Sequence, residues 1–367
     1  MFKETYNVIG VMSGTSLDGI DLAHVVFTIK DGKWNFQLLD CETVSYPIDW
    51  LNKLKGAVDF SDIELQKLNS DYTSYIGTII NDFVMQNKIQ NLDAICSHGH
   101  TILHQPENGI TLQIGNLPEI AKITNQTVVC DFRVQDVVLG GQGAPLVPIG
   151  DEILFSDYDY CLNLGGFSNV SFNKNGERIA FDISPVNTVL NFYANKLDLD
   201  YDDKGEISES GKINYFLLNE LNSLKFYSKT YPKSLGFEFV KNTILPIIEN
   251  YTISIEDKMA TFTEHIAIQT ALALNRFETR NNNQSKLLIT GGGAYNDFLV
   301  SRIKSNMPKI EIIIPNPKIL EFKEALIFAL LGVLKLRNEI NVLSSVTGAK
   351  KNHSSGIIFK LDEANHL

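Results

Sequence analysis

The sequence has few cysteines, and they lie far apart. The 367 residues contain four, Cys41, Cys96, Cys130 and Cys161, and no two of them form a Cys-x-x-Cys pair. This spacing argues against a disulfide framework and against a cysteine-based zinc site. It favours reduced, buried thiols in a cytoplasmic protein.

Positive charge is also scarce. Lys and Arg together number 32 against 43 Asp and Glu, for a formal net charge of −11. Binding to nucleic acid backbones requires clustered Lys and Arg, so nucleic acid is excluded as a partner. An anionic small molecule is not excluded as a ligand, because its binding depends on the charge of its own pocket and not on the net charge of the chain.

Long apolar runs are absent as well. The longest is "EALIFALLGVLKL", residues 324–336, which is shorter than the roughly 20 residues needed to span a bilayer. We therefore expect a buried helix here and no membrane partner. Residues 1–5 lead directly into a predicted strand, so we also expect no secretory leader.

The composition and the length of the chain are those of a folded globular protein. Hydrophobic residues make up 44% and charged residues 20% of the sequence, as in globular proteins. A chain of 367 residues is too long for one ordinary core, so two domains are expected.

The predicted elements repeat a pattern. Three strands, over residues 6–12, 21–30 and 33–46, precede an amphipathic helix over 62–88 and further strands over 92–99 and 127–132. Residues 159–185 again hold three strands, followed by helices, strands over 285–290 and 309–315, and a helix from Glu321. We predict an N-terminal domain over 1–135, a C-terminal domain over 136–340, and a tail over 341–367 that returns toward the cleft or the first domain. Ligands prefer such an interdomain cleft.

Three glycine-rich turns each follow a predicted strand, at residues 14–21, 163–169 and 290–296. Glycines let backbone N–H groups approach an anion closely, and the third turn also opens a helix, whose N-terminus favours negative charge. None matches the G-x-x-x-x-G-K-[ST] or G-x-G-x-x-G pattern. Taken singly, each turn is explained more simply as the place where a strand ends.

The turns occur at positions in the chain that resemble those of the glycine-rich turns in the actin-like ATPase superfamily. Within that superfamily, the chain is most similar to the anhydro-N-acetylmuramic acid kinase family. The motifs that carry the resemblance run in family order: "GVMSGTSLDGID", "SHG.T..H.P", "DFR..D...GGQGAPLVP", "NLGG.SN", "YD..G", "PKS.G.E", "AT.T", "GGGA.N" and "SVTGA". The resemblance implies an α/β fold of two actin-like ATPase (ribonuclease H-like) domains, each with a mixed five-stranded sheet and helices, flanking a central cleft.

The family's activity implies an ATP-dependent kinase in cell-wall recycling. Such an enzyme opens 1,6-anhydro-N-acetylmuramic acid with water and phosphorylates O6 to give N-acetylmuramic acid 6-phosphate. Two alternatives stay open: a kinase of the same fold for another amino sugar, and a non-catalytic nucleotide-binding protein. The resemblance also implies a homodimer.

The reaction needs one base to take a proton from water, and we predict that this base is Asp182, where the family motif has its catalytic aspartate. Mg²⁺ should accompany ATP, held through water by Asp18 and Asp21. The residues predicted to bind ATP are Gly14, Thr15, Ser16, Asp18, Gly19, Asp21, Gly165, Gly166, Gly291, Gly292, Gly293 and Asn296.

The predicted sugar-binding residues are His98, Arg133, Asp136, Asn187 and Glu324. Arg133 is suited to hold the lactyl carboxylate through a bidentate pair. Glu324, at the start of the apolar helix, faces either the sugar hydroxyls or solvent. His98 belongs to a run of three histidines that also invites a zinc hypothesis, although the family motif accounts for two of them without metal.

One loop departs from the family pattern. The family commonly has Asp-Thr-Gly-Pro-Gly-Asn at residues 182–187, whereas this chain has Ser184 and Val186 in place of the glycines. A β-branched residue is strained wherever φ must be positive. We therefore expect an altered loop shape rather than lost activity.

Overall fold

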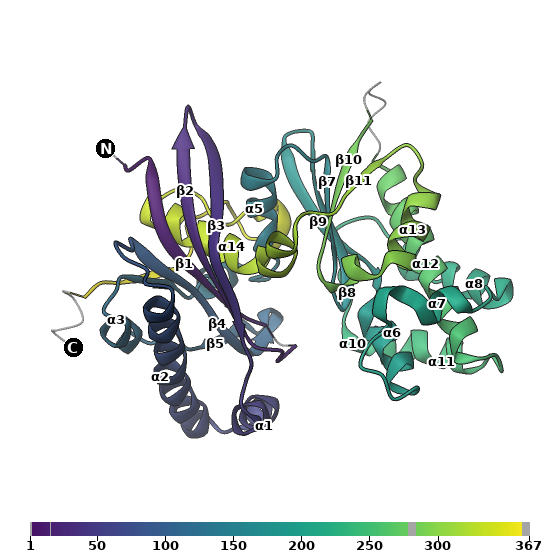
Figure 1. Cartoon of the computed structure of the whole chain (residues 1–367), viewed down its shortest axis with the longest axis horizontal. Helices are drawn as coiled ribbons and strands as arrows, with labels where there is room; N and C mark the ends of the chain where they lie inside the picture. Colours follow the sequence, from purple (N-terminus) through teal and green to yellow (C-terminus); the bar gives the residue numbers. More distant parts are fainter. Residues whose placement is uncertain (1, 15, 278–283, 362–367) are drawn as a thin grey trace. The chain divides into compact units, whose positions relative to one another are not determined.

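The computed structural model describes residues 2–14, 16–277 and 284–361 (Figure 1). The chain divides into two compact units, residues 1–154 with 322–367, and residues 155–321. The boundaries predicted at 135 and 341 therefore both fall inside the first unit. Residues 322–340 pack with the first unit because Gly332 lies directly against Cys96 and Gly10 against Ala325. Residues 136–154 pack on the same segment, where Lys323 pairs with Asp151 at 2.7 Å.

The sheet of the first unit has seven strands in the order β12-β6-β4-β1-β2-β3, with β5 paired to β4. Strand β2 runs antiparallel to β1 and β3, whereas β1, β4 and β6 are parallel. The strands are β1 (Thr5–Ser13), β2 (Ile20–Lys30), β3 (Lys33–Val44), β4 (Ala94–Gln105), β5 (Ile110–Ile114), β6 (Val128–Cys130) and β12 (Ile357–Phe359).

The expected five strands are thus extended by two. Strand β5 forms a hairpin with the end of β4, and β12 pairs antiparallel with β6, which places Ile357 opposite Cys130. The C-terminal segment thereby completes the sheet of the first unit.

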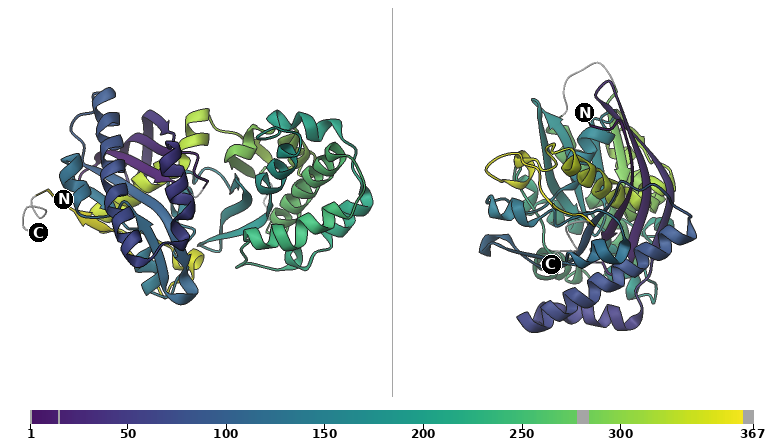
Figure 2. Two further views of the ribbon diagram at one scale, coloured as in Figure 1. Left: turned by 90° about the horizontal axis from the view of Figure 1, so that it is seen from below. Right: turned by 90° about the vertical axis from the view of Figure 1, so that its left-hand side faces the viewer.

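Helices cover both faces of this sheet (Figure 2). Helix α2 packs with Ile9 and Val11 of β1, whereas α14 packs on Gly10 of β1, where a Cβ atom would lie 1.9 Å from the Ala325 carbonyl oxygen. The helices are α1 (Ile48–Gly56), α2 (Asp62–Gln86), α3 (Glu119–Thr124), α4 (Val134–Val138), α5 (Val147–Leu154), α14 (Pro317–Leu336) and α15 (Ser344–Thr347). Helix α14 is interrupted by the non-helical Phe322, at the boundary between the units.

The sheet of the second unit has five strands in the order β11-β10-β7-β8-β9. Strand β8 is antiparallel to β7 and β9, whereas β7, β10 and β11 are parallel, which repeats the core topology of the first sheet. This repeated mixed topology confirms the expected pair of actin-like ATPase domains. The strands are β7 (Tyr160–Leu164), β8 (Phe167–Lys174), β9 (Glu177–Pro185), β10 (Lys286–Thr290) and β11 (Glu311–Ile313).

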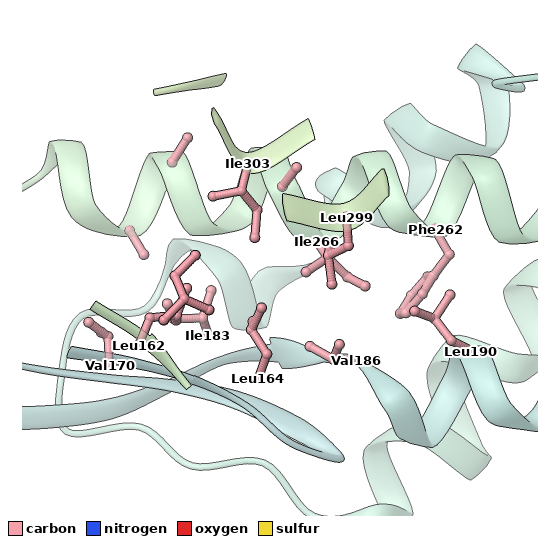
Figure 3. Packing of buried hydrophobic residues seen from close by; sticks show 14 of the residues in the cluster. Leu162, Leu164, Val170, Ile183, Val186, Leu190, Phe262, Ile266, Leu299 and Ile303 are labelled. Atoms are coloured by element: carbon pink, nitrogen blue, oxygen red, sulfur yellow. The ribbon is translucent and has the colours of Figure 1, made fainter. Parts of the chain in front are cut away.

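The core of the second unit lies between this sheet and the helices that pack on it, the longest of which is α12. Figure 3 shows Leu164 and Val186 on the sheet side of the core, and Phe262 and Ile266 of α12 on the helix side. The helices are α6 (Asn187–Asn195), α7 (Glu206–Ser210), α8 (Tyr215–Asn222), α9 (Lys225–Ser228), α10 (Phe237–Phe239), α11 (Leu245–Glu249), α12 (Ile255–Asn275) and α13 (Asp297–Asn306).

The apolar run identified in the sequence forms most of α14, with Ala325 to Leu331 fully or almost fully buried. None of the helices in the described part of the chain has the length and apolarity needed to cross a membrane.

Candidate functional site

The first glycine-rich turn joins β1 to β2 in the first unit. Ser13 pairs with Ile20 at the end of the hairpin, and within the turn the Leu17 N–H donates to the Gly14 carbonyl at 3.3 Å. Ser16 Oγ donates to Asp18 Oδ1 at 2.8 Å. Thr15 lies outside the described residues. The turn is therefore closed by its own backbone and hydroxyl groups.

Gly19 and Asp21, two further predicted residues, lie at the end of this turn and contact β3. Gly19 has φ +154°, and a Cβ atom there would lie 2.8 Å from the Val44 carbonyl oxygen, so only glycine fits without displacing the strand. Asp21 Oδ1 accepts a hydrogen bond of 2.6 Å from Thr43 Oγ1. Asp18 and Asp21 thus both occupy defined positions near the turn.

A buried hydrogen-bond network of three hydroxyl groups and one imidazole lies next to the turn, at Ser13. Ser13 Oγ lies 2.7 Å from His100 Nδ1 and 2.6 Å from the Tyr46 hydroxyl, which in turn lies 2.5 Å from the Tyr72 hydroxyl. Burial lowers the pKa of His100 to about 4, so its imidazole is neutral. Sequence reasoning missed this network, because its members come from four distant segments and form no motif.

Arg133 and His98 form the second part of the first-unit site. Arg133, at the start of α4, donates from Nε to His98 Nε2 at 2.8 Å and from Nη1 to the Gly143 carbonyl at 2.7 Å. Among the described residues no acceptor is bonded to Nη2, which leaves that edge of the guanidinium for a ligand. Burial lowers the pKa of Arg133 to about 10, a value at which the side chain is still a cation at neutral pH.

Glu324 lies on α14 just after the break at Phe322. It keeps access to solvent, yet the protein around it removes enough water to raise its pKa. The positive charge of Arg133 opposes that shift, whereas the negative charges of Asp21 and Asp18 add to it. Asp18, Asp21 and Arg133 are therefore all within electrostatic reach of Glu324.

Asp136 is enclosed by protein rather than presented to a ligand. Its side chain is 0% exposed. Oδ2 accepts from the Gly143 N–H at 2.7 Å, and Oδ1 accepts from Thr347 Oγ1 at 2.8 Å. Its carboxylate thus joins the glycine-rich segment over residues 139–148 to Thr347 in the C-terminal part of the chain. These contacts favour a positioning role over the predicted contact with the sugar.

Asp182, the predicted base, lies on β9 in the second unit. Its Oδ2 accepts a hydrogen bond of 2.8 Å from the Leu235 N–H, and its own N–H donates to the Lys233 carbonyl at 3.1 Å. Burial raises the pKa of Asp182 to about 6, against the opposing effects of the Leu235 hydrogen bond and the Lys233 charge. A carboxylate with this pKa is ionised at neutral pH and is basic enough to accept a proton.

The two glycine-rich turns of the second unit contact each other. Gly291 has φ +84°, and a Cβ atom there would lie 2.8 Å from the Leu164 carbonyl oxygen. A Cβ atom on Gly293 would lie 2.7 Å from Leu164 Cβ. Glycines are required here because one turn rests on the other.

The same region holds the remaining predicted residues of the second unit. The N–H of Asn187, the first residue of α6, donates to the Gly165 carbonyl at 3.2 Å, and the Thr188 N–H donates to the Gly166 carbonyl at 3.2 Å. A Cβ atom on Gly292 would lie 3.8 Å from Asn187 Nδ2, so this glycine is next to the Asn187 side chain.

Asn296 is buried and caps α13. Its Oδ1 accepts from the Leu299 N–H at 2.8 Å. This bond accounts for Oδ1 without a nucleotide, and the part of Asn296 in binding ATP stays a prediction.

The loop that departs from the family pattern is accommodated without positive φ. Val186 has φ −131° and is fully buried, and its side chain packs into the core beside Leu164 and Leu190 (Figure 3). Ser184 is also buried, with its Oγ 3.0 Å from Ser168 Oγ. Both replacements thus fill space that glycines would leave.

The three histidines of β4 have separate partners. His98 contacts Arg133 and His100 contacts Ser13, whereas His104 is exposed and lies 3.1 Å from Thr111 Oγ1. In the part of the chain that the structure describes, no three His, Cys, Asp or Glu side chains are arranged to hold a metal ion. This geometry gives no support to the zinc hypothesis.

Comparison with known proteins identifies the family. The profile of anhydro-N-acetylmuramic acid kinases matches residues 6–361. The anhydro-N-acetylmuramic acid kinase of Haemophilus influenzae is 34% identical over 96% of this chain and 98% of its own length. The enzyme of the same name from Pseudomonas syringae pv. syringae is 35% identical over 96% and 98%.

A solved structure, the Acidaminococcus fermentans (R)-2-hydroxyglutaryl-CoA dehydratase component A, is also similar. It covers 90% of this chain and 99% of its own, with a TM-score of 0.46 at 13% identity, too low to bear on function. The full-length profile match and the identity to the curated relatives decide the assignment. The chain belongs to the anhydro-N-acetylmuramic acid kinase family.

Proposed function

We propose that this protein phosphorylates 1,6-anhydro-N-acetylmuramic acid with ATP and water, and that Asp182 is the base. Family membership over nearly the whole chain supports the substrate. The observation that carries the catalytic assignment is the Asp182 carboxylate, held by the Leu235 N–H with its pKa raised to about 6.

The reaction balances with one base. Water attacks the anomeric carbon and gives its proton to Asp182, while the bond from that carbon to O6 breaks. O6 bonds to the γ-phosphorus of ATP and ADP leaves. Most glycoside hydrolases need a second carboxyl group to protonate the departing oxygen. Here phosphorus captures that oxygen, so a single base suffices.

In this proposal Arg133 binds the lactyl carboxylate of the sugar. Its Nε and Nη1 are anchored on His98 and Gly143, so the guanidinium plane is fixed before a ligand arrives. A guanidinium and a carboxylate form short, charge-assisted hydrogen bonds. Glu324, held near Arg133, is then suited to accept from the sugar hydroxyls.

The first turn and the turn over residues 163–169 supply backbone N–H groups for the phosphates of ATP, and the turn over residues 290–296 holds its adenosine. Phosphoryl transfer draws on Mg²⁺ to neutralise charge on those phosphates. The oxygen ligands that Mg²⁺ prefers are present in Asp18 and Asp21, whose charges add to the raised pKa of Glu324. Two neighbouring carboxylates of this kind are suited to bind a divalent cation.

We further propose that the protein acts in cell-wall recycling in the cytoplasm and that it is a homodimer. Size-exclusion chromatography tests the dimer.

The decisive experiment measures ADP release from ATP with 1,6-anhydro-N-acetylmuramic acid and with a panel of other amino sugars. The proposal requires release with the anhydro sugar and its loss in Asp182→Asn. Release with a different sugar alone would discard the substrate, and ATP binding without sugar-dependent release would discard the kinase.

A further inference from the structure

The proposed base has a polar neighbour on the next strand, on the face of the second sheet that lies opposite the core. Val170 and Phe181 are both buried in that core, and Figure 3 shows Val170 on its sheet side. Side chains alternate along a strand. Asn169 of β8 and Asp182 of β9 therefore both point to the opposite face.

Asn169 and Asp182 lie directly opposite each other across the two strands. The Asp182 N–H donates to the Lys233 carbonyl, so it points away from β8. In an antiparallel pair of this kind, with no backbone hydrogen bonds between its two members, the Cα atoms are about 4.5 Å apart and the side chains are close. The register shifts by one residue just beyond the pair, as at a β-bulge, and bulges next to active sites direct side chains.

The two facing side chains do not bond to each other. Asp182 Oδ2 accepts a hydrogen bond of 2.8 Å from the Leu235 N–H, and none of the described residues donates to its Oδ1. The Asn169 amide has no hydrogen-bond partner within the described ranges, and both residues are partly exposed. Two such groups side by side are suited to bond to one water molecule.

The polar face continues from Asn169 toward the glycine-rich turns. Asn163 of β7 is opposite Asn169, and its side chain lies against both turns of the second unit. A Cβ atom on Gly291 would lie 2.6 Å from Asn163 Oδ1, and a Cβ atom on Gly165 would lie 3.2 Å from Asn163 Nδ2. Asn169 is thus one strand away from the proposed base and one strand away from the residue that contacts the turns proposed to hold ATP.

The proposed reaction needs an oriented water molecule at such a place. One O–H of the water must point at the base, and a lone pair must point at the anomeric carbon. With the base as its only partner, the water is free to rotate about that hydrogen bond. A second acceptor beside the base removes this freedom, and the amide oxygen of an asparagine is an acceptor.

We propose that Asn169 is a second catalytic residue, whose Oδ1 accepts a hydrogen bond from the attacking water. This inference rests on the proposed reaction. The other proton of the water passes to Asp182 as the water oxygen bonds to the anomeric carbon. The bond from that carbon to O6 breaks, and O6 bonds to the γ-phosphorus. The proton that faces Asn169 stays on the product, in its anomeric hydroxyl group.

Asn169→Leu tests the contact, because leucine is similar in size and cannot accept a hydrogen bond. We expect kcat with 1,6-anhydro-N-acetylmuramic acid to fall about tenfold to hundredfold. The affinity for ATP, measured by isothermal titration calorimetry, should stay unchanged, because the contact is made in the chemical step and the backbone of the turns is untouched. A merely structural role would change both quantities.

Asn169→Asp is the second variant, since it keeps Oδ1 and adds a negative charge opposite Asp182. The acceptor is retained, so kcat at high pH should exceed that of Asn169→Leu. Repulsion between the two carboxylates raises the pKa of Asp182, against the Lys233 charge that acts on it in both proteins. The rising limb of kcat/KM against pH should therefore move up by about one unit.

Asn173→Asp is the matched control for the added charge. Asn173 lies on the same strand and the same face as Asn169, but it is opposite Arg178 and not Asp182. Its Oδ1 accepts from the Gly176 N–H at 3.1 Å, and an aspartate keeps that bond. The limb of this variant should stay where it is in the unchanged protein.

An unchanged kcat in Asn169→Leu would overturn the inference. So would a loss of ATP affinity as large as the loss of kcat, or an Asn169→Asp protein as inactive as Asn169→Leu at every pH. These outcomes all require sugar-dependent ADP release by the unchanged protein. Absence of that release would instead overturn the proposed function, and this inference with it.

Discussion

Arg133 Nε donates a hydrogen bond of 2.8 Å to His98 Nε2. His98 Nδ1 lies 2.9 Å from the Gly99 carbonyl oxygen, so the imidazole proton is on Nδ1 and Nε2 is the acceptor. Burial and the adjacent Arg133 charge hold the pKa of His98 well below its usual value. His98 therefore acts as a neutral acceptor that orients Arg133, and it is unsuited to serve as a general acid.

Arg133→Lys should weaken sugar binding. A lysine ammonium keeps the charge but cannot hold His98, Gly143 and a carboxylate in one plane. We expect the KM for the anhydro sugar to rise about tenfold, with a smaller change in kcat. Arg337→Lys is the control, because Arg337 pairs with Glu339 at 2.7 Å, away from the predicted residues. An unchanged KM in Arg133→Lys would contradict the assigned contact.

The activity should depend on the ionisation of Asp182. Burial raises the pKa of this carboxyl to about 6, and only the ionised form accepts a proton from water. The profile of kcat/KM against pH should therefore rise through an apparent pKa of about 6 and level off above it. Steady-state kinetics from pH 5 to 8 measure this limb. A profile that is flat through this region would show that another group is the base.

Asp182→Asn should abolish activity yet stabilise the protein at neutral pH. The folded-state pKa is raised from 3.8 to about 6, so the folded state binds the proton more tightly than the unfolded state does, and stability falls as pH rises between these two values. The ionised carboxylate thus costs about 3 kcal/mol at pH 7. Asparagine avoids this cost and can still accept from the Leu235 N–H.

Urea denaturation at several pH values measures this effect. The free energy of unfolding of Asp182→Asn should exceed that of the unchanged protein at pH 7, and the difference should vanish below about pH 4. A difference that persists unchanged at low pH would mean that it does not come from ionisation of Asp182.

Much of the fold follows from local patterns. The helical spacing of apolar residues predicted residues 62–88 as a helix, and α2 spans Asp62–Gln86. The division into units could not be read in this way, because residues 322–340, predicted to lie in the C-terminal domain, join the first unit through packing such as that of Gly332 on Cys96. The three-residue β12 is too short for any periodicity to reveal it.

Residue types within motifs are what predict Asp182, Arg133 and the glycine-rich turns as members of the site, and their roles stay predictions. The surroundings of these residues could not be predicted in this way. Burial sets the raised pKa of Asp182, and the contact of Ser13 with His100 joins residues far apart in the sequence. Asp136 is the converse case, since the motif marks it but the fold encloses it.

The contact between the two second-unit turns can be isolated with a matched pair of variants. Gly291 and Gly176 both have φ +84°, but a Cβ atom on Gly176 would meet nothing within 4 Å, whereas on Gly291 it would lie 2.8 Å from the Leu164 carbonyl oxygen. Gly176→Ala should cost about 1 kcal/mol from backbone strain alone. Gly291→Ala should cost about 1–3 kcal/mol more and should weaken ATP binding. Equal losses of stability in the two variants, measured by thermal unfolding, would contradict the close approach of the turns.

Restoring the family's glycine at residue 186 should destabilise this protein. Val186 is fully buried and packs with Leu164 and Leu190, and its φ of −131° needs no glycine. Val186→Gly should lower the free energy of unfolding by about 2–4 kcal/mol, because it leaves a cavity and increases the entropy of the unfolded chain. Val186→Ala, which keeps the Cβ, should cost about 1 kcal/mol less than Val186→Gly. If Val186→Gly instead unfolds at the same urea concentration as the unchanged protein, the side chain does not contribute to the core, and the loop has a different conformation from the one described.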